Sequence, residues 1–257
     1  MSAISFRFET GTATHTGRVR EVNEDGLFAC PDWGVWVVAD GMGGHENGRL
    51  ASTTIVEEVS TLGTAVSAPD LLARFRDRIF RANAKLLHVA RRQGDNVIIG
   101  STVAAVLVYG AHYACVWSGD SRIYLVRGDR IRQISRDHTE VQELVDNGSI
   151  SPDEARNWPR RNVITRAVGI FDDPGLDLIQ GELEAGDTFI ICSDGLTGPV
   201  EDAEILLNID AHAPQVACDA LIDMALERGA RDNVTVIVVR CMVDKPAVAA
   251  PLSGDSA

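Results

Sequence analysis

The stretch WGVWVVADGMGGHENG, residues 33–48, carries an almost wholly apolar segment directly into Asp40 and then into a glycine-rich turn. A short apolar run bounded by turn residues is typical of a strand buried in a core. A carboxylate at the end of such a strand costs free energy unless a cation or several hydrogen-bond donors meet it. The fold of this chain must therefore bring other charged or polar groups to that strand end.

Other aspartates occupy similar positions in the sequence. The segments CVWSGD and FIICSD end on Asp120 and Asp194, and Asp232 stands directly before the apolar run NVTVIVV. Each aspartate alone is explained by a turn or a cap. Together they predict a carboxylate cluster, in which a hard divalent cation would relieve the mutual repulsion. Oxygen ligands favour Mg²⁺ or Mn²⁺, and the backbone carbonyl of Gly41, which has no side chain beside it, is a further candidate ligand.

The segment RVREVNEDG adds two more acids, Glu24 and Asp25, and places Arg20 four residues before the first of them. A guanidinium can hold a phosphoryl group through two hydrogen bonds, although a surface arginine explains the same residue. The competing hypothesis of a dinucleotide-binding turn is set aside, because GMGGHENG has Glu46 where the motif GxGxxG needs its third glycine.

Composition limits the classes of partner. The net charge is −13 over 257 residues, which argues against nucleic acid or an anionic membrane as the main partner. No apolar run is long enough to span a bilayer, and the N-terminus lacks the basic and apolar regions of a signal peptide. The five cysteines include no CxxC pair. Reduced, buried thiols in a cytoplasmic protein are therefore expected.

Apolar periodicity and turn residues predict strands and helices in blocks rather than in alternation. The expected strands cover residues 5–13, 27–30, 35–39, 177–183, 187–194 and 233–241. Four further segments between residues 101 and 135 are expected to form one antiparallel meander. The expected helices cover residues 48–62, 70–92 with Asp70 as the N-cap, 202–208 and 214–229. This order favours antiparallel sheets with helices packed outside them.

The motifs RVREVNED, VADGMGG, SGDSR, SRDHT, SDGL and RDNVTV occur in this order. Together they resemble the metal-dependent protein serine/threonine phosphatases, the protein phosphatase 2C family, in its compact bacterial form. The resemblance covers about residues 14–240. It implies an α+β fold, a four-layer α-β-β-α sandwich of two antiparallel sheets flanked by helices. The phosphatase domain would cover residues 1–243 with a small flap at about 136–162, and residues 244–257 would form a disordered tail.

The resemblance also implies a site with two Mn²⁺ or Mg²⁺ ions. Asp40 would bridge both ions, the Gly41 carbonyl would bind one, and Asp194 and Asp232 would bind the other. Asp120 corresponds to the ligand of a third ion. The other residues that the resemblance implies are Arg20 for the phosphoryl group, and Glu24, Asp25 and Asn233 for orienting the ligands and metal-bound water.

The implied activity is hydrolysis of phosphoserine and phosphothreonine in proteins by a metal-activated water, opposing a bacterial serine/threonine kinase in signal transduction. Many eukaryotic members carry a histidine where this chain has Met42, which cannot protonate the leaving oxygen. A metal-bound water or His45 is then the candidate acid. The alternative is a pseudophosphatase that acts as a binding or regulatory module, but the four core aspartates favour the enzyme. A monomer acting on phosphorylated proteins, with no nucleic-acid partner and no membrane insertion, is expected.

Overall fold

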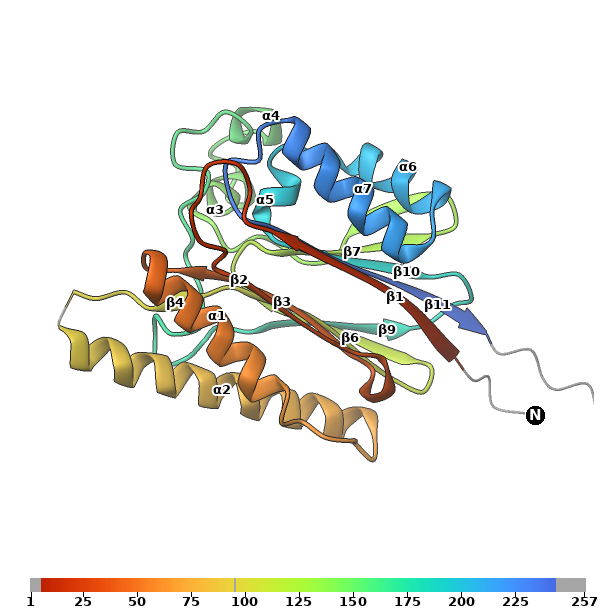
Figure 1. Cartoon of the computed structure of the whole chain (residues 1–257), viewed down its shortest axis with the longest axis horizontal. Coiled ribbons are helices and arrows are strands. Elements are labelled where there is room, and N and C mark those ends of the chain that lie inside the picture. The colour runs from red at the N-terminus through yellow and green to blue at the C-terminus, as the bar shows by residue number, and fades with distance from the viewer. Residues whose placement is uncertain (1–5, 95, 244–257) are drawn as a thin grey trace, which may run out of the picture.

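Four layers make up the computed structural model, with two antiparallel sheets in the middle and helices outside both of them (Figure 1). The structure describes residues 6–94 and 96–243, so the predicted tail 244–257 lies outside the described residues. The first sheet has the order β1 (Phe6–His15), β11 (Val234–Val243), β10 (Thr188–Cys192), β7 (Arg122–Arg127) and β8 (Arg130–Gln133). The second has the order β2 (Asp25–Cys30), β3 (Val35–Met42), β5 (Val103–Tyr109), β6 (His112–Ser118) and β9 (Asp177–Glu182), and β4 (Gly100–Ser101) pairs with β3. The predicted α+β sandwich is confirmed.

Helices cover the outer face of each sheet. The second sheet packs against α1 (His45–Val59) and α2 (Ala68–Gln93), and the first against α5 (Asp194–Thr197), α6 (Asp202–Ala211) and α7 (Pro214–Glu227). A short 3-10 helix, η1 (Pro31–Trp33), joins β2 to β3. The segment predicted to form a small flap contains α3 (Glu140–Asp146) and α4 (Pro152–Ala155). We call residues 136–162 the flap.

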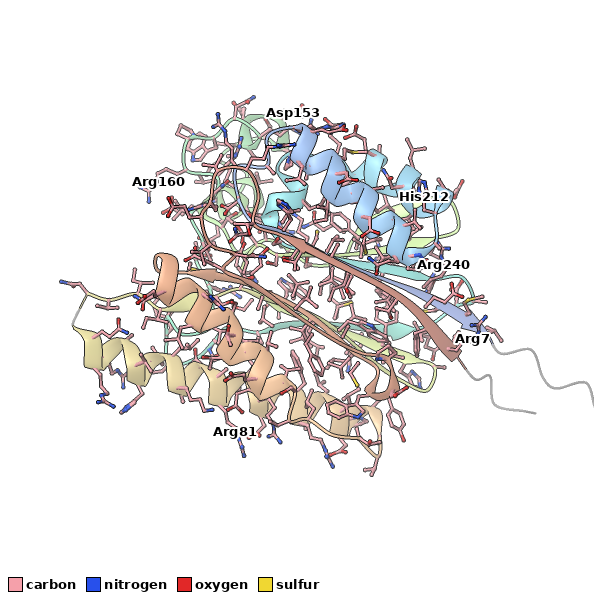
Figure 2. All side chains as sticks on the ribbon, in the orientation of Figure 1. Arg7, Arg81, Asp153, Arg160, His212 and Arg240 are labelled. Carbon is pink, nitrogen blue, oxygen red and sulfur yellow. The ribbon has the colours of Figure 1, made fainter. Side chains whose placement is uncertain are left out.

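Side chains fill the spaces between all four layers (Figure 2). Along β3, Trp36 and Val38 point into the space between the sheets, whereas Val35 and Val37 point toward α1 and α2. Both faces of β3 are therefore buried, which explains why its sequence is continuously apolar rather than alternating. A strand of this kind can end on a charge only where it leaves the core.

The four segments between residues 101 and 135 do not form the single meander that the sequence predicted. The hairpin of β5 and β6 belongs to the second sheet, and the hairpin of β7 and β8 belongs to the first. The chain crosses between the sheets at residues 119–121, where Gly119 has φ +108°. A Cβ at Gly119 would lie 2.6 Å from the Thr102 side chain, so this crossover requires glycine. Turn residues predicted both hairpins, but they carry no information about which sheet a hairpin joins.

The N-cap of α2 is Ser67, not Asp70 as the sequence predicted. The Asp70 N–H donates to Ser67 Oγ over 3.2 Å, and the Asp70 carboxylate accepts the Val66 N–H over 3.0 Å. The helix begins earlier than expected because Pro69 lies within its first turn, where a missing N–H costs nothing.

We expect Ser67→Ala to lower the free energy of unfolding by about 1 kcal/mol, because the Asp70 N–H loses its capping acceptor. Denaturant unfolding followed by circular dichroism measures this change. The matched control is Ser60→Ala, at the exposed end of α1, which should stay within about 0.5 kcal/mol of wild type. Equal losses in both variants would contradict the assignment of the cap.

Candidate active site

Acidic side chains from both sheets gather at one end of the sandwich: Asp25, Asp40, Asp120, Asp194 and Asp232. Asp25 and Asp40 stand opposite each other on β2 and β3. The Ser193 hydroxyl donates to Asp25 Oδ2 over 2.8 Å, which ties the end of β10 in the first sheet to β2 in the second. Asp120 lies on the crossover, Asp194 begins α5, and Asp232 stands two residues before the start of β11. The structure thus brings together all the strand-end aspartates that the sequence singled out.

These carboxylates repel one another where little water reaches them. Burial raises the pKa of Asp40 well above its usual value, and the charges of the other four aspartates raise it further. Burial is also the main cause that raises the pKa of Asp25 and of Asp194 to about 6, and it raises the pKa of Asp120. The cluster without a cation therefore holds protons that a solvated aspartate would have lost.

The donor atoms of this cluster fit a hard divalent cation. Asp25 Oδ1 is buried and makes no hydrogen bond, although its partner oxygen accepts from Ser193. Among the described residues, no group of three or more His, Cys, Asp or Glu side chains could hold a metal ion by itself. Ions such as Mg²⁺ need only one or two carboxylates and keep several waters. The all-oxygen donor set and its excess negative charge suit such an ion.

Gly41 is buried where α1 approaches the end of β3. Its N–H donates to the Glu24 carbonyl over 3.2 Å, and a Cβ at this position would lie 2.0 Å from the Gly48 carbonyl oxygen. Close backbone packing therefore already requires glycine here, independently of any cation. The role of the Gly41 carbonyl as a ligand stays a prediction.

Asn233 anchors the loop that carries Arg20. Its side-chain oxygen accepts the Glu24 N–H over 2.8 Å, and its amide nitrogen donates to two carbonyls of the loop over 2.8 and 3.0 Å. Arg20 Nη2 donates to Asp232 Oδ2 over 2.8 Å, and about half of the Arg20 side chain is exposed. The loop thus places a half-exposed guanidinium directly beside the carboxylate cluster.

Met42 and the candidate acid His45 lie where β3 passes into α1. Met42 ends β3 and is half-buried. His45 is the first residue of α1, but its side chain lies outside the described part of the protein. Its role as an acid therefore stays a prediction.

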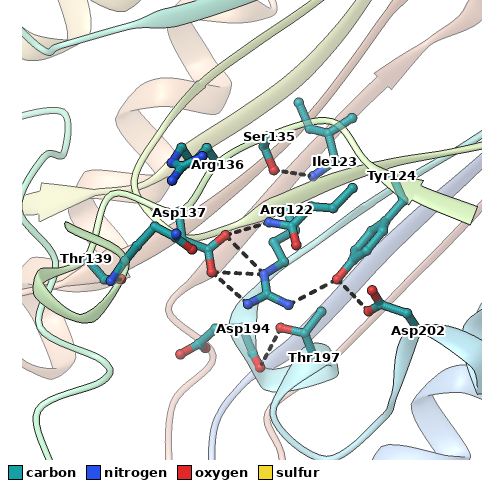
Figure 3. Close-up of polar contacts among 12 residues, drawn as sticks. Arg122, Ile123, Tyr124, Ser135, Arg136, Asp137, Thr139, Asp194, Thr197 and Asp202 are labelled. Carbon is teal, nitrogen blue, oxygen red and sulfur yellow. Dashed lines mark hydrogen bonds and ion pairs between the residues drawn. The ribbon is translucent and has the colours of Figure 1, made fainter. Parts of the chain in front are cut away.

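A half-buried arginine beneath the cluster was not predicted. Arg122 donates to both oxygens of Asp137 over 2.7 to 3.0 Å, and its Nη1 donates to the Tyr124 hydroxyl over 3.1 Å (Figure 3). That hydroxyl in turn donates to Asp202 at the start of α6 over 3.0 Å. The positive charge of Arg122 lowers the pKa of Asp194, against the effect of burial. The fold therefore supplies part of the charge compensation for its own acids.

The only sequence signal for this pair was its place in two motifs, SGDSR and SRDHT. Arg122 and Asp137 are separated by fifteen positions, and the hairpin of β7 and β8 closes that distance. From the sequence alone, an arginine and an aspartate at this spacing cannot be distinguished from two exposed charges. Only the hairpin brings them together.

We expect Arg122→Met to lower the free energy of unfolding by about 3 kcal/mol, because it leaves the mostly buried Asp137 carboxylate without its charged partner. Thermal and urea unfolding measure the loss. The double variant Arg122→Met/Asp137→Leu should regain much of it, since no unpaired charge then remains. A single variant as stable as wild type would show that the ion pair contributes nothing.

The fold and this cluster define a sandwich protein with a carboxylate centre at one end of its two sheets. The chain belongs to the protein phosphatase 2C family, because the sequence profile of that family matches residues 14–217. Among the described residues, none of the helices has the length and apolar character needed to cross a membrane.

Curated relatives and solved structures agree with this assignment. The chain is 36% identical to the serine/threonine protein phosphatase PstP of Mycobacterium tuberculosis over 99% of its own length, and spans about half (50%) of that relative. It is 34% identical to the serine/threonine phosphatase stp of Listeria innocua, covering 88% of this chain and 93% of the relative.

Two solved structures superpose closely on the fold. PppA, described as a key regulatory component of T6SS in Pseudomonas aeruginosa, has a TM-score of 0.87 at 37% identity, covering 93% of this chain and 100% of that one. The catalytic domain of PstP in complex with two manganese ions has a TM-score of 0.83 at 33% identity, with coverage of 93% and 100%.

Proposed function

We propose that this protein is a metal-dependent phosphatase that hydrolyses phosphoserine and phosphothreonine in proteins. The observation that carries the proposal is the partly buried cluster of mutually repelling aspartates beside the half-exposed guanidinium of Arg20. A divalent cation neutralises such a cluster, and an arginine beside it suits a phosphate monoester. The relatives named as serine/threonine phosphatases, and the PstP structure with two manganese ions, support the same chemistry.

In this proposal Asp40, the Gly41 carbonyl, Asp194 and Asp232 hold two Mn²⁺ or Mg²⁺ ions, and Asp120 holds a third. When bound, the ions would lower the pKa of a water nucleophile and withdraw charge from the phosphoryl group. Asp25 lies among these ligands with one oxygen fixed by Ser193 and the other without a hydrogen bond, so it can accept from water.

The protein's own groups bind and orient the phosphoryl group. Arg20 donates to Asp232 through Nη2 alone, so its other N–H groups can donate to the phosphoryl oxygens when substrate binds. Asn233 keeps the Arg20 loop and Glu24 against the end of β11. The departing seryl or threonyl oxygen needs a proton that Met42 cannot supply, and the candidate donors are His45 and a metal-bound water.

The proposal extends to the setting of the enzyme. Residues 1–243 act as one phosphatase domain, and the flap, which carries exposed charges from α3 and α4, controls access of phosphorylated proteins. A cognate serine/threonine kinase supplies the substrates, and the protein acts as a monomer in the cytoplasm. The bacterial relatives that are named serine/threonine phosphatases support phosphorylated proteins as the substrates.

Turnover of a phosphothreonine peptide and of an aryl phosphate, with Mn²⁺, with Mg²⁺ and with a chelator, tests the proposal. Wild type should be active only with a cation, and Asp194→Asn should be inactive while folded. His45→Ala should slow the peptide more than the aryl phosphate, because an aryl oxygen leaves without protonation more readily. No turnover with any metal would overturn the enzyme and favour a binding module.

A further inference from the structure

His138 lies where the flap leaves the sandwich, and only 6% of it is exposed. Its backbone N–H donates to the Gly119 carbonyl over 2.9 Å, and its carbonyl accepts the Thr165 N–H over 2.8 Å. Its Nδ1 accepts the Gly119 N–H over 3.2 Å, and its Nε2 lies 3.0 Å from Asp177 Oδ2. One residue therefore joins the crossover before Asp120, the chain that leaves the flap, and β9.

These contacts select one tautomer of the ring. Nδ1 accepts the Gly119 N–H, so it carries a lone pair, and Nε2 then carries the proton that it donates to Asp177. Asp177 is itself held by Arg166 Nη1 at 3.3 Å. The Trp117 ring stacks on the imidazole, with centroids 6.3 Å apart and an interplanar angle of 24°. The position and the hydrogen-bond direction of His138 are both determined by its surroundings.

Hydrogen bonds also connect the crossover to Thr102, next to Asp40. Ser121 Oγ lies 2.6 Å from Thr102 Oγ1, and the same Thr102 oxygen accepts the Asp40 N–H over 3.0 Å. Thr102 N–H donates to the Asp40 carbonyl over 2.8 Å. Asp120 thus sits on a segment clamped between His138 at the base of the flap and Thr102 beside Asp40.

We propose that His138 is a positioning residue that couples the flap to the carboxylate cluster. The imidazole accepts the Gly119 N–H, and this contact fixes the position of the adjacent Asp120 within the carboxylate cluster. A displacement of the flap moves His138 through its backbone bonds and so moves Asp120. This inference rests on the proposed function, because it concerns the cation site of that phosphatase.

Two variants of His138 separate this role from simple packing. His138→Asn keeps an acceptor atom where Nδ1 stands and loses the contact with Asp177, whereas His138→Leu loses both. We expect His138→Leu to weaken Mn²⁺ binding, measured by calorimetry, by about tenfold or more. The Gly119 amide should exchange with solvent faster in His138→Leu, and His138→Asn should keep most of its protection.

Asp177→Asn tests the tautomer with little change in shape. An amide that donates to Nε2 moves the ring proton to Nδ1, where it faces the Gly119 N–H, as a related substitution does in serine proteases. Heteronuclear NMR of the ring should show the proton on Nε2 in wild type. In Asp177→Asn, kcat should fall by about tenfold while KM for an aryl phosphate stays near that of wild type.

The outcomes distinguish the two proposals. Wild type without metal-dependent turnover would overturn the proposed function, while calorimetry and amide exchange would still decide the role of His138. A proton on Nδ1 in wild type would overturn the positioning role. A folded His138→Leu protein that binds Mn²⁺ as tightly as wild type, and whose Gly119 amide exchanges as slowly, would also overturn this role. If the His138→Leu protein does not fold, Asp177→Asn decides the question. An Asp177→Asn protein with the Mn²⁺ affinity and the kcat of wild type would then overturn the positioning role of His138.

Discussion

We expect the Asp40→Asn protein to be catalytically inactive yet more stable than wild type when both are free of metal. The activity should fall by about 10³-fold or more, because Asp40 is the proposed ligand common to both ions. The stability should rise because Asp40 is the carboxylate that all four neighbouring aspartates repel. A gain of about 1 kcal/mol would raise the Tm by about 2 °C in a chain of this size. Phosphatase assays and scanning calorimetry in chelator measure the two effects.

The matched control is Asp187→Asn at the far end of the sandwich. Asp187 is fully buried and paired with Arg127 at 2.7 Å, so the loss of its charge should destabilise the protein. Its turnover with Mn²⁺ should equal that of wild type at temperatures where both are folded. An Asp40→Asn protein that is less stable than wild type in chelator would contradict the repulsion inferred for the cluster.

The second large effect is a loss of stability of the metal-free protein as the pH rises. Burial raises the pKa of Asp25 and of Asp194 from the usual 3.8 to about 6, so the folded state binds their protons more tightly than the unfolded state. The stabilisation of the folded state by these two protons is fully present below about pH 4 and is lost as the pH rises through about 6. The two groups together should account for a loss on the order of 5 kcal/mol between about pH 4 and about pH 7.

Urea unfolding at a series of pH values, in chelator and in Mn²⁺, measures this dependence. The cation should remove most of the loss, because it replaces the protons as the neutralising charge. In Asp194→Asn, the dependence without metal should be shallower than in wild type. A metal-free protein whose stability increases over this pH range would show that the carboxylates are not buried together in solution.

Several features of the fold could be predicted because they depend on short stretches of sequence. The helix predicted over residues 70–92 spans Ala68–Gln93, and the strand predicted over 233–241 spans Val234–Val243. The clustering of Asp40, Asp120, Asp194 and Asp232 was also predicted, since each stands beside an apolar run. Their individual roles came from the resemblance to the family and remain proposals.

Other features depended on contacts that no local pattern encodes. The crossover at residues 119–121 sends β7 and β8 to the opposite sheet, which turn residues alone did not indicate. The ion pair of Arg122 with Asp137 exists only once the hairpin of β7 and β8 has formed. The double contact of His138 with Gly119 exists only once the chain after that hairpin has returned to the crossover.

The sequence by itself determined which segments become strands and helices, and that several aspartates stand where buried strands end. Periodicity, turns and caps act over a few residues, so these properties are readable along the chain. Only the tertiary structure decided which sheet each hairpin joins and which partner each buried charge finds. Those outcomes follow from long-range packing and from the removal of water around Asp25, Asp40 and Arg122. Desolvation acts on a charged side chain only after distant segments of the chain have packed around it.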